Sequence, residues 1–241
     1  MHSKILNFHA KQKNSSLWHF RLGHLAPKIL ILILSRIGLS MSSSLSTCNC
    51  TSCLKAKMKN LPFPMSLSTS LTPLALVHSD VWGPSPIISS HGSQFYVSFI
   101  DNFSKFTWLF PIAYKSDVPS IVQEFVPFIE NQLSQKMKVF RFDGGGEFCN
   151  NSLQSFFEIK GISHQKSCPY TPKQNDIAEH KHRPIVETTM SLIFHSSSPL
   201  EFWPYAFSTV VFLINRMPSL SLHVLSPFEK FFLVILLICI I

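Results

Sequence analysis

The sequence has few of the features that mark secreted or membrane-spanning proteins. Its first fourteen residues, MHSKILNFHAKQKN, contain neither the apolar stretch nor the small-residue cleavage site of a signal peptide. An apolar run at residues 231–241, FFLVILLICII, is shorter than the roughly 20 apolar residues that a membrane-spanning helix needs. No internal repeat is visible. We therefore expect a protein of an intracellular, reducing compartment with no membrane partner.

Acidic residues are also scarce, which leaves the chain basic. The 21 Lys and Arg outnumber the 13 Asp and Glu and give a net charge of +8. A basic balance suits a polyanionic partner such as nucleic acid, although many proteins are basic for other reasons. The hydrophobic fraction of 46% and the aromatic fraction of 12% argue against a disordered chain. A length of 241 residues allows one domain of ordinary size and a smaller one.

The cysteines favour metal binding over a disulfide framework, because Cys48, Cys50 and Cys53 fall within six residues. With His19 and His24 upstream, the pattern is H-x4-H-x25-C-x2-C. Imidazole and thiolate ligands suit tetrahedral zinc, and four protein ligands leave no open position, so the role would be structural. Metal-coupled folding would stabilise a segment too short for a secure core. Chance scatter is the alternative, and Cys48 is a spare thiol that could compete as a ligand.

Changes of composition divide the chain into five segments. A linker of small polar residues, MSLSTSLTP, separates the cysteine cluster from a longer part whose sequence pattern indicates alternating strands and helices. We expect a loose N-terminal tail at 1–16, a zinc-binding module at 17–64, the linker at 65–73, a larger domain at 74–230 and an aberrant hydrophobic tail at 231–241.

The larger domain reads as an α/β layered fold. Aromatic, β-branched and apolar segments predict strands at 74–82, 94–101, 105–112, 137–142 and 162–167. Helical spacing of apolar residues and helix stop signals predict helices at 117–134, 152–161, from about 177 onward and 199–215. Because proline removes a helical hydrogen bond, we expect Pro127 to interrupt the first of these helices and Pro184 to kink the third.

Three acids sit in settings that suggest phosphodiester chemistry. Asp80 (HSDVWGPSP) and Asp143 (FRFDGGGEF) lie near strand ends, and Glu179 (TPKQNDIAEHKH) follows on a helix after the 35 residues 144–178. Clustered carboxylates of this kind hold two divalent ions, Mg²⁺ or Mn²⁺, that activate a nucleophile and stabilise a leaving oxygen. Singly, each acid could be a loop, turn or exposed helix residue. Asp101, at a hairpin turn, and Glu147, which would cap the next segment, are not expected to bind metal.

These motifs resemble the polyprotein of copia-type LTR retrotransposons over residues 17 to about 230. LWHFRLGH and CTSCLKAKMKNLPFP are similar to the GAG-pre-integrase zinc segment of that family. HSDVWGPSP, FYVSFIDNFSKFTWLFPI, RFDGGGEF, HQKSCPYTPKQNDIAEHKH and FWPYAFSTVVFLINRMPS are similar to its integrase catalytic core. The resemblance implies an RNase H-like core, with a mixed five-stranded sheet flanked by helices, preceded by a small helical zinc-binding module.

The resemblance also implies a function. It is that of a DDE strand transferase in DNA integration, in which a 3′-hydroxyl of element DNA attacks a target phosphodiester. Position by position, the catalytic acids that bind Mg²⁺ or Mn²⁺ match Asp80, Asp143 and Glu179, and the Zn²⁺ ligands match His19, His24, Cys50 and Cys53. The implied partners are element and target DNA and further copies of the chain, and the implied location of integration is the nucleus.

Basic and polar residues beside the third acid are candidates for contacts with DNA phosphates. They flank Glu179 on the loop and helix that would face the element ends, and they are Lys173, Gln174, Lys181, His182 and Arg183. Binding through such a cluster would be sensitive to salt. The alternative is a solvated basic helix face.

The chain departs from the family pattern at several points. Gly144 stands where the family has Asn, Asp176 stands where it has Gly and adds negative charge near the third acid, and Pro184 lies within that acid's helix. With the tail at 231–241, these departures suggest a truncated copy, and they favour the alternative of a catalytically inactive remnant that only binds nucleic acid. A ribonuclease H-type hydrolase is a third possibility, against which the zinc pattern and the 35-residue spacing argue.

Overall fold

The computed structural model describes residues 15–38, 50–56, 70–167 and 176–238, without the side chains of 15–16, 54–56, 176–180 and 233–238. Its centre is one mixed sheet of five strands in the order β3-β2-β1-β4-β5. The strands are β1 Val77–Trp82, β2 Phe95–Asp101, β3 Thr107–Ile112, β4 Val139–Phe142 and β5 Ser163–Lys166. β1, β2 and β3 pair antiparallel, whereas β4 pairs parallel with both β1 and β5. The predicted mixed five-stranded sheet is confirmed.

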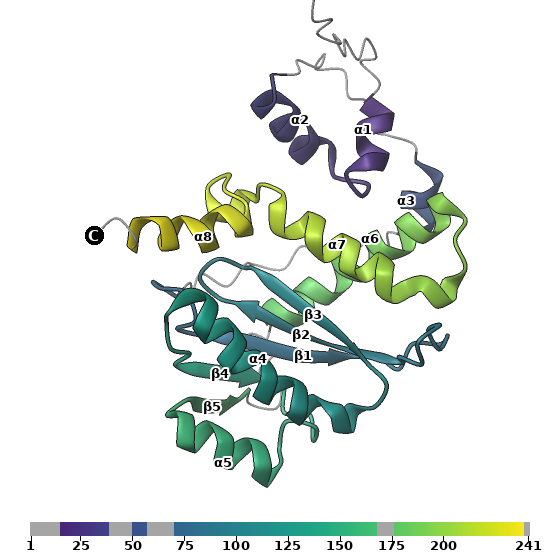
Figure 1. Ribbon diagram of the computed structural model, residues 1–241. Coiled ribbons are helices and arrows are strands. Elements are labelled where there is room, and N and C mark those ends of the chain that lie inside the picture. Colours follow the sequence, from purple (N-terminus) through teal and green to yellow (C-terminus); the bar gives the residue numbers. More distant parts are fainter. Residues whose placement is uncertain (1–14, 39–49, 57–69, 168–175, 239–241) are drawn as a thin grey trace, which may run out of the picture.

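Helices cover both faces of the sheet (Figure 1). One face packs against α4 (Val118–Leu133) and α5 (Asn151–Lys160), and the other against α6 (Asp176–Ser196) and α7 (Trp203–Arg216). Successive strand residues point to opposite faces. In β2, Val97 and Phe99 therefore pack on the side of α4 and α5, and Tyr96 packs on the side of α6 and α7. This two-sided burial explains why the strands read as nearly continuous apolar and aromatic runs.

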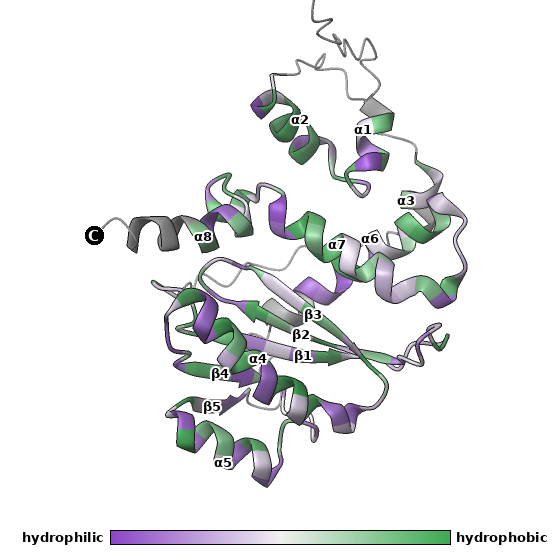
Figure 2. Cartoon of the chain, in the orientation of Figure 1, coloured by the Kyte–Doolittle hydropathy of each residue, from purple (hydrophilic) through white to green (hydrophobic). Residues whose placement is uncertain are grey.

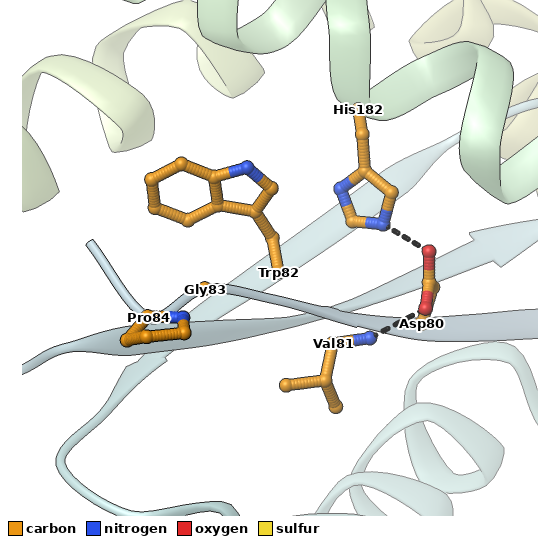
Figure 3. A pocket seen from close by; sticks show the side chains of 6 residues that line it. All are labelled: Asp80, Val81, Trp82, Gly83, Pro84 and His182. Carbon is orange, nitrogen blue, oxygen red and sulfur yellow. Dashed lines mark hydrogen bonds and ion pairs between the residues drawn. The ribbon is translucent and has the colours of Figure 1, made fainter. Parts of the chain in front are cut away.

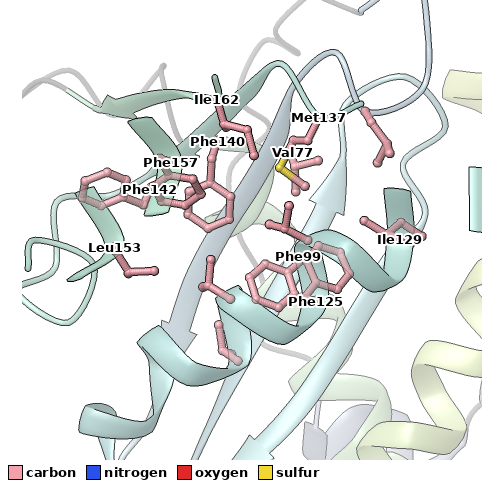
Figure 4. Close-up of a cluster of buried hydrophobic side chains, with 14 of the residues drawn as sticks. Val77, Phe99, Phe125, Ile129, Met137, Phe140, Phe142, Leu153, Phe157 and Ile162 are labelled. Atoms are coloured by element: carbon pink, nitrogen blue, oxygen red, sulfur yellow. The ribbon is translucent and has the colours of Figure 1, made fainter. Parts of the chain in front are cut away.

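The core under α4 and α5 is built largely from aromatic rings (Figure 4). Phe99 of β2 stacks on Phe125 of α4 with ring centroids 4.1 Å apart, and Phe140 of β4 lies 5.0 Å from Phe157 of α5. All four rings are at most 2% exposed. Burial of each such side chain contributes about 1.5–3 kcal/mol, so this layer supplies much of the stability that holds β1 against β4.

The opposite core lies under α6 and α7. Trp82 and Tyr96, partners across β1 and β2, stack with centroids 5.2 Å apart and an interplanar angle of 19°. Phe207 of α7 packs 4.8 Å from Tyr96, and the indole N–H of Trp203 donates to the Ile87 carbonyl at 3.0 Å. Aromatic groups from the second helical layer therefore pack beside the end of β1.

The N-terminal part forms three short helices beside this layer. They are α1 (Ser15–Arg21), α2 (Pro27–Arg36) and α3 (Thr51–Ala56), and hydrophobic residues dominate α2 and α7 (Figure 2). Phe20 of α1 stacks on His195 of α6 at 4.5 Å, and a Cβ on Gly23 would come within 3.0 Å of Leu213 of α7. The predicted small helical module is thus packed closely against the larger domain.

Pro127 does not interrupt its helix, and the helix that contains Pro184 is continuous through it. α4 runs from Val118 to Leu133 with Pro127 inside it, and α6 runs from Asp176 to Ser196 with Pro184 inside it. A proline removes only one N–H, and the surrounding turns gain more from burying their apolar faces, which include Val126 and Ile129 beside Pro127. For Pro127, proline alone was a misleading signal, because tertiary packing decides the outcome.

The last described helix, α8, runs from Pro227 to Ile238, so the predicted boundary at residue 231 falls inside it. Phe231 is 1% exposed and packs 5.0 Å from Phe106 and 5.3 Å from Trp108, next to β3. Three single-turn 3-10 helices, Lys115–Asp117, Leu200–Phe202 and Leu220–Leu222, complete the described elements. No helix among the described residues is both long and apolar enough to cross a membrane.

Candidate metal centres

The chain reverses direction directly after α1, and this reversal brings two histidines together. Gly23 and His24 have φ angles of +74° and +60°, and the His24 N–H donates to the His19 carbonyl at 2.7 Å. The two imidazole rings then lie 4.8 Å apart. Glycine adopts this left-handed conformation at little cost, so the GH pair after the helix is a sequence signal for the turn.

Cys50 and Cys53, at the start of α3, complete a four-residue cluster whose ligand atoms all lie within 4.8 Å of one another. His24 Nδ1 is 3.2 Å from Cys50 Sγ, 3.4 Å from Cys53 Sγ and 3.2 Å from His19 Nε2. Metal–ligand bonds of about 2.0–2.3 Å in a tetrahedron separate ligand atoms by roughly 3.3–3.8 Å. The cluster is therefore compatible with one tetrahedral zinc ion.

The surroundings of His19 also fit a metal ligand. Its Nδ1 lies 3.0 Å from the Leu25 carbonyl, so the Nδ1–H tautomer donates there and leaves Nε2 facing the cluster. Nε2 is 3.4 Å from Cys53 Sγ. His19, His24 and Cys50 are at most 7% exposed, which leaves no room for an open coordination position. This arrangement suits a structural ion.

The sheet brings Asp80 next to Asp143. β1 and β4 pair in parallel with Ser79 opposite Phe142, so the next position on each strand is one of these two acids. Parallel partners share a face, and both side chains therefore lie on the side of α6. Asp80 is 8% exposed, whereas Asp143, just past the end of β4, is exposed.

The proximity of the two acids is reflected in the pKa of Asp143. Partial burial is the main cause that raises this pKa above its ordinary value, and a hydrogen bond from the Gly145 N–H, at 2.9 Å, opposes it. The negative charges of Asp80 and Glu147 raise the pKa further, as does a hydrogen bond between the Asp143 and Asp80 carboxyls. A divalent cation would remove this repulsion, and such carboxylate pairs suit cation binding.

Asp80 is held by two further contacts (Figure 3). Its Oδ1 accepts a hydrogen bond from the Val81 N–H at 2.9 Å, and its Oδ2 lies 2.6 Å from Nε2 of His182. An open cavity of about 390 Å³ adjoins this pair and is lined by Asp80, Val81, Trp82, Gly83, Pro84 and His182. The space beside the buried acid is thus accessible from outside.

Glu179 belongs to α6, but its side chain is outside the described part of the chain. It precedes His182 by three residues, and positions three apart on a helix lie on the same side. Because His182 contacts Asp80, the turn of α6 that carries Glu179 lies close to β1. The structure brings two of the three predicted acids together and places the helix of the third beside them.

The two acids that were not expected to bind metal, Asp101 and Glu147, have structural roles. Asp101 is fully buried, and its carboxylate accepts from the Leu74 N–H and from both the N–H and the hydroxyl of Ser104. Glu147 pairs with Lys115 at 3.0 Å. Glu147 does not cap α5 with its side chain as expected.

That capping role belongs to Asn150, whose side chain accepts from the Leu153 N–H at 2.8 Å. A short Asn side chain at the N-cap reaches the free N–H groups of the first helical turn, whereas Glu147 lies three residues earlier.

The candidate DNA contacts have different surroundings. Lys173 and Gln174 lie outside the described residues. Burial, with the charge of Lys105, lowers the pKa of Lys181 to about 8, and Arg183 donates to Glu187 at 2.7 Å. His182 faces Asp80, a role that sequence reasoning missed because spacing along a helix does not show which strand the helix covers.

Comparison with known proteins gives this arrangement a context. Residues 71–172 match the family described as integrase core domain. The chain is 43% identical over 224 residues to the Retrovirus-related Pol polyprotein from transposon RE1 of Arabidopsis thaliana. The aligned region covers 92% of this chain and 15% of the relative. The chain is 41% identical to the corresponding polyprotein of transposon RE2 from the same plant, with the same coverage. A third relative, from transposon TNT 1-94 of Nicotiana tabacum, is 34% identical over 90% of this chain and 16% of the relative.

The mixed sheet, the integrase core match and the His and Cys cluster define an RNase H-like integrase core preceded by a small HHCC module. Within that class, the chain belongs to the copia-type retrotransposon Pol polyproteins and is integrase-like. It spans about 15% of the length of the first two relatives. The family resemblance predicted from the motifs is confirmed.

Proposed function

We propose that this chain acts as a metal-dependent DDE strand transferase that joins element DNA to target DNA. The observation that carries the proposal is the parallel register of β1 and β4, which sets Asp80 beside Asp143 on the face covered by the helix of Glu179. Two strand-end carboxylates and a helix carboxylate are the ligand set that phosphodiester chemistry with divalent ions requires.

The chain's own residues would hold the reacting groups. Asp80, Asp143 and Glu179 would bind Mg²⁺ or Mn²⁺, which, when bound, activates the 3′-hydroxyl and stabilises the leaving oxygen. Asp80 is buried and fixed by its neighbours, whereas Asp143 is exposed toward solvent. This asymmetry would let DNA enter from the side of Asp143 while Asp80 keeps its orientation.

We further propose that His19, His24, Cys50 and Cys53 bind one Zn²⁺ with a structural role, as their ligand-atom distances support. DNA binding would use Lys173, Gln174, Lys181 and Arg183 and would weaken as salt rises. A homo-oligomer and a nuclear location for the integration step complete the proposal, because the family resemblance implies both.

A strand-transfer assay tests this function. Labelled terminal-repeat DNA is incubated with the full chain, target DNA and Mg²⁺ or Mn²⁺, and Asp80→Ala and Asp143→Ala are compared with wild type. We expect metal-dependent product from wild type and none from either variant. Glu124→Ala, which removes an exposed acid distant from the site, is the matched control. Wild type giving no more product than Asp80→Ala, with DNA binding retained, would support the inactive nucleic-acid-binding remnant instead.

A further inference from the structure

We propose that His182, braced by Tyr96, is a positioning residue that orients the Asp80 carboxylate and anchors the start of α6 on β1. The inference rests on the proposed function, in which Asp80 is a metal ligand. It assigns to His182 a role toward another side chain, in place of the predicted contact with DNA.

The imidazole bridges two groups on neighbouring strands. His182 Nε2 lies 2.6 Å from Asp80 Oδ2 on β1, and Nδ1 is hydrogen bonded to the Tyr96 hydroxyl on β2 at 2.8 Å. With a proton on Nε2 facing the carboxylate, Nδ1 of the neutral ring accepts from the tyrosine. The ring is therefore hydrogen bonded through Nδ1 and in close contact with the Asp80 carboxylate through Nε2, and these two contacts restrict its orientation.

Tyr96 is a rigid support for this ring. It is fully buried, stacks on Trp82 at 5.2 Å and packs 4.8 Å from Phe207. Burial raises the pKa of its hydroxyl far above the ordinary value, so the hydroxyl keeps its proton at neutral pH and stays a donor. A donor held in this way restricts His182 to one position above β1.

The contact fixes Asp80 from both sides. Oδ1 accepts from the Val81 backbone at 2.9 Å and Oδ2 faces His182, so the carboxylate plane has one orientation. A carboxylate oxygen has lone pairs to spare for a cation beyond one such contact. Groups of this kind, which hold a ligand without touching the metal, change metal affinity about 10–100-fold when they are removed.

The same contact locates the beginning of α6. The eight residues before this helix, 168–175, are not among those described, and His182 of α6 contacts Asp80 of β1. Glu179 is three residues earlier on the same helix. Anchoring His182 therefore sets the distance between the turn of the third acid and the pair on the sheet.

Exposure argues against the DNA contact for this residue. The side chains of His182 and Asp80 are each 12% exposed, which leaves His182 little surface for a phosphate. Its neighbours Lys181, which is partly exposed, and Arg183, whose side chain is 34% exposed, remain the candidates for DNA contact on this turn.

Metal binding by the full zinc-loaded chain tests the inference. Mn²⁺ binding is titrated by electron paramagnetic resonance for wild type, His182→Ala, His182→Gln, Tyr96→Phe and Asp80→Ala. We expect His182→Ala to bind Mn²⁺ about tenfold more weakly. The amide N–H of His182→Gln reaches the place of Nε2, so this variant should recover most of the binding, and Tyr96→Phe should fall between wild type and His182→Ala.

His91→Ala is the matched control, because His91 is an exposed histidine whose contacts are with Ser90 and Tyr205. It should bind Mn²⁺ as wild type does. Zinc content and urea unfolding of each variant establish that the fold is intact, and His182→Gln serves if His182→Ala does not fold.

The outcomes separate this inference from the proposed function. If Asp80→Ala loses Mn²⁺ binding and folded His182→Ala does not, the positioning role is wrong while the acidic metal site stands. If His182→Ala binds Mn²⁺ more tightly than wild type, His182 blocks the site, which also overturns the inference. If wild type and Asp80→Ala bind equally, the proposed acidic site itself fails.

Discussion

At the scale of single residues, the acids of this chain differ by what surrounds their carboxylates. Asp101 accepts three hydrogen bonds from Leu74 and Ser104, so both of its carboxylate oxygens have donors within the fold. Asp80 lines an open cavity and interacts with Asp143. All three residues are aspartates, and their surroundings differ because the turns around them supply different hydrogen-bond donors.

Replacement of Asp101 should therefore reduce stability without acting through metal. Asp101→Ala leaves buried N–H groups of Leu74 and Ser104 without an acceptor, and we expect a loss of about 2–4 kcal/mol in the free energy of unfolding. Urea denaturation measures it, with exposed Glu124→Ala expected within about 0.5 kcal/mol of wild type. An effect of Asp101→Ala as small as that of Glu124→Ala would contradict the structural role.

The lowered pKa of Lys181 leads us to expect that DNA binding depends on pH. This pKa is lowered to about 8, so the side chain is charged below pH 8 and loses its charge as the pH rises through that value. A phosphate favours the charged form, hence binding takes up a proton, and affinity should fall between pH 7 and 9. Lys181→Arg keeps its charge throughout this range. Fluorescence anisotropy should show a smaller decline for this variant, and an identical decline would exclude Lys181.

At the scale of elements, the sequence located all five strands and the four helices that flank them, because alternation and helical spacing are strong over these segments. Their ends differ by a few residues, as at β1, which begins at Val77 where the prediction had residue 74. The last helix was predicted as one piece from residue 199 but is divided into a 3-10 turn and α7 at Trp203. Helix ends depend on tertiary contacts that short motifs do not record.

The prolines give a quantitative test at this scale. Pro184 is exposed within α6, so its removal restores a backbone N–H without leaving a cavity. We expect Pro184→Ala to raise the free energy of unfolding by about 1–3 kcal/mol. Thermal unfolding measures the change, and the partly buried Pro127 should give a smaller gain because its ring contributes packing. A destabilised Pro184→Ala would show that the ring has a role in packing or folding.

At the scale of the whole molecule, the HHCC module is joined to the integrase core at more than one place. Phe20 stacks on His195 of α6, and Arg36 donates to the Val224 carbonyl at 2.6 Å and pairs with Glu229 of α8 at 3.4 Å. The Arg36–Glu229 pair is exposed and contributes at most about 1 kcal/mol. Apolar packing therefore holds the module, together with the zinc ion that we propose for the His and Cys cluster.

Loss of zinc should consequently unfold the module and leave the core folded. Cys53→Ser removes one of four ligands, and we expect zinc content to fall from one ion per chain toward zero. Limited proteolysis should then cut ahead of residue 70 while the fragment containing the sheet persists. Serine in place of the exposed Cys149 is the control and should keep its zinc. Less than one zinc per wild-type chain would contradict the four-ligand site.

The two candidate sites differed in how far the sequence could predict them. The His and Cys cluster was predicted from the spacing of its four residues along the chain, and the structure brings these four together. The acidic site depends on which strands become neighbours, and the β1–β4 pairing joins segments about sixty residues apart. The role of His182 depends in addition on which helix covers that pair, and local patterns do not contain this information.

The location of bound Mn²⁺, observed by anomalous scattering from crystals of the chain, tests the central claim most directly. The account predicts ions about 3.5–4 Å apart that are bound by Asp80, Asp143 and Glu179. Mn²⁺ bound only at other acids, such as Glu147, with Asp80 and Asp143 free of metal, would contradict it.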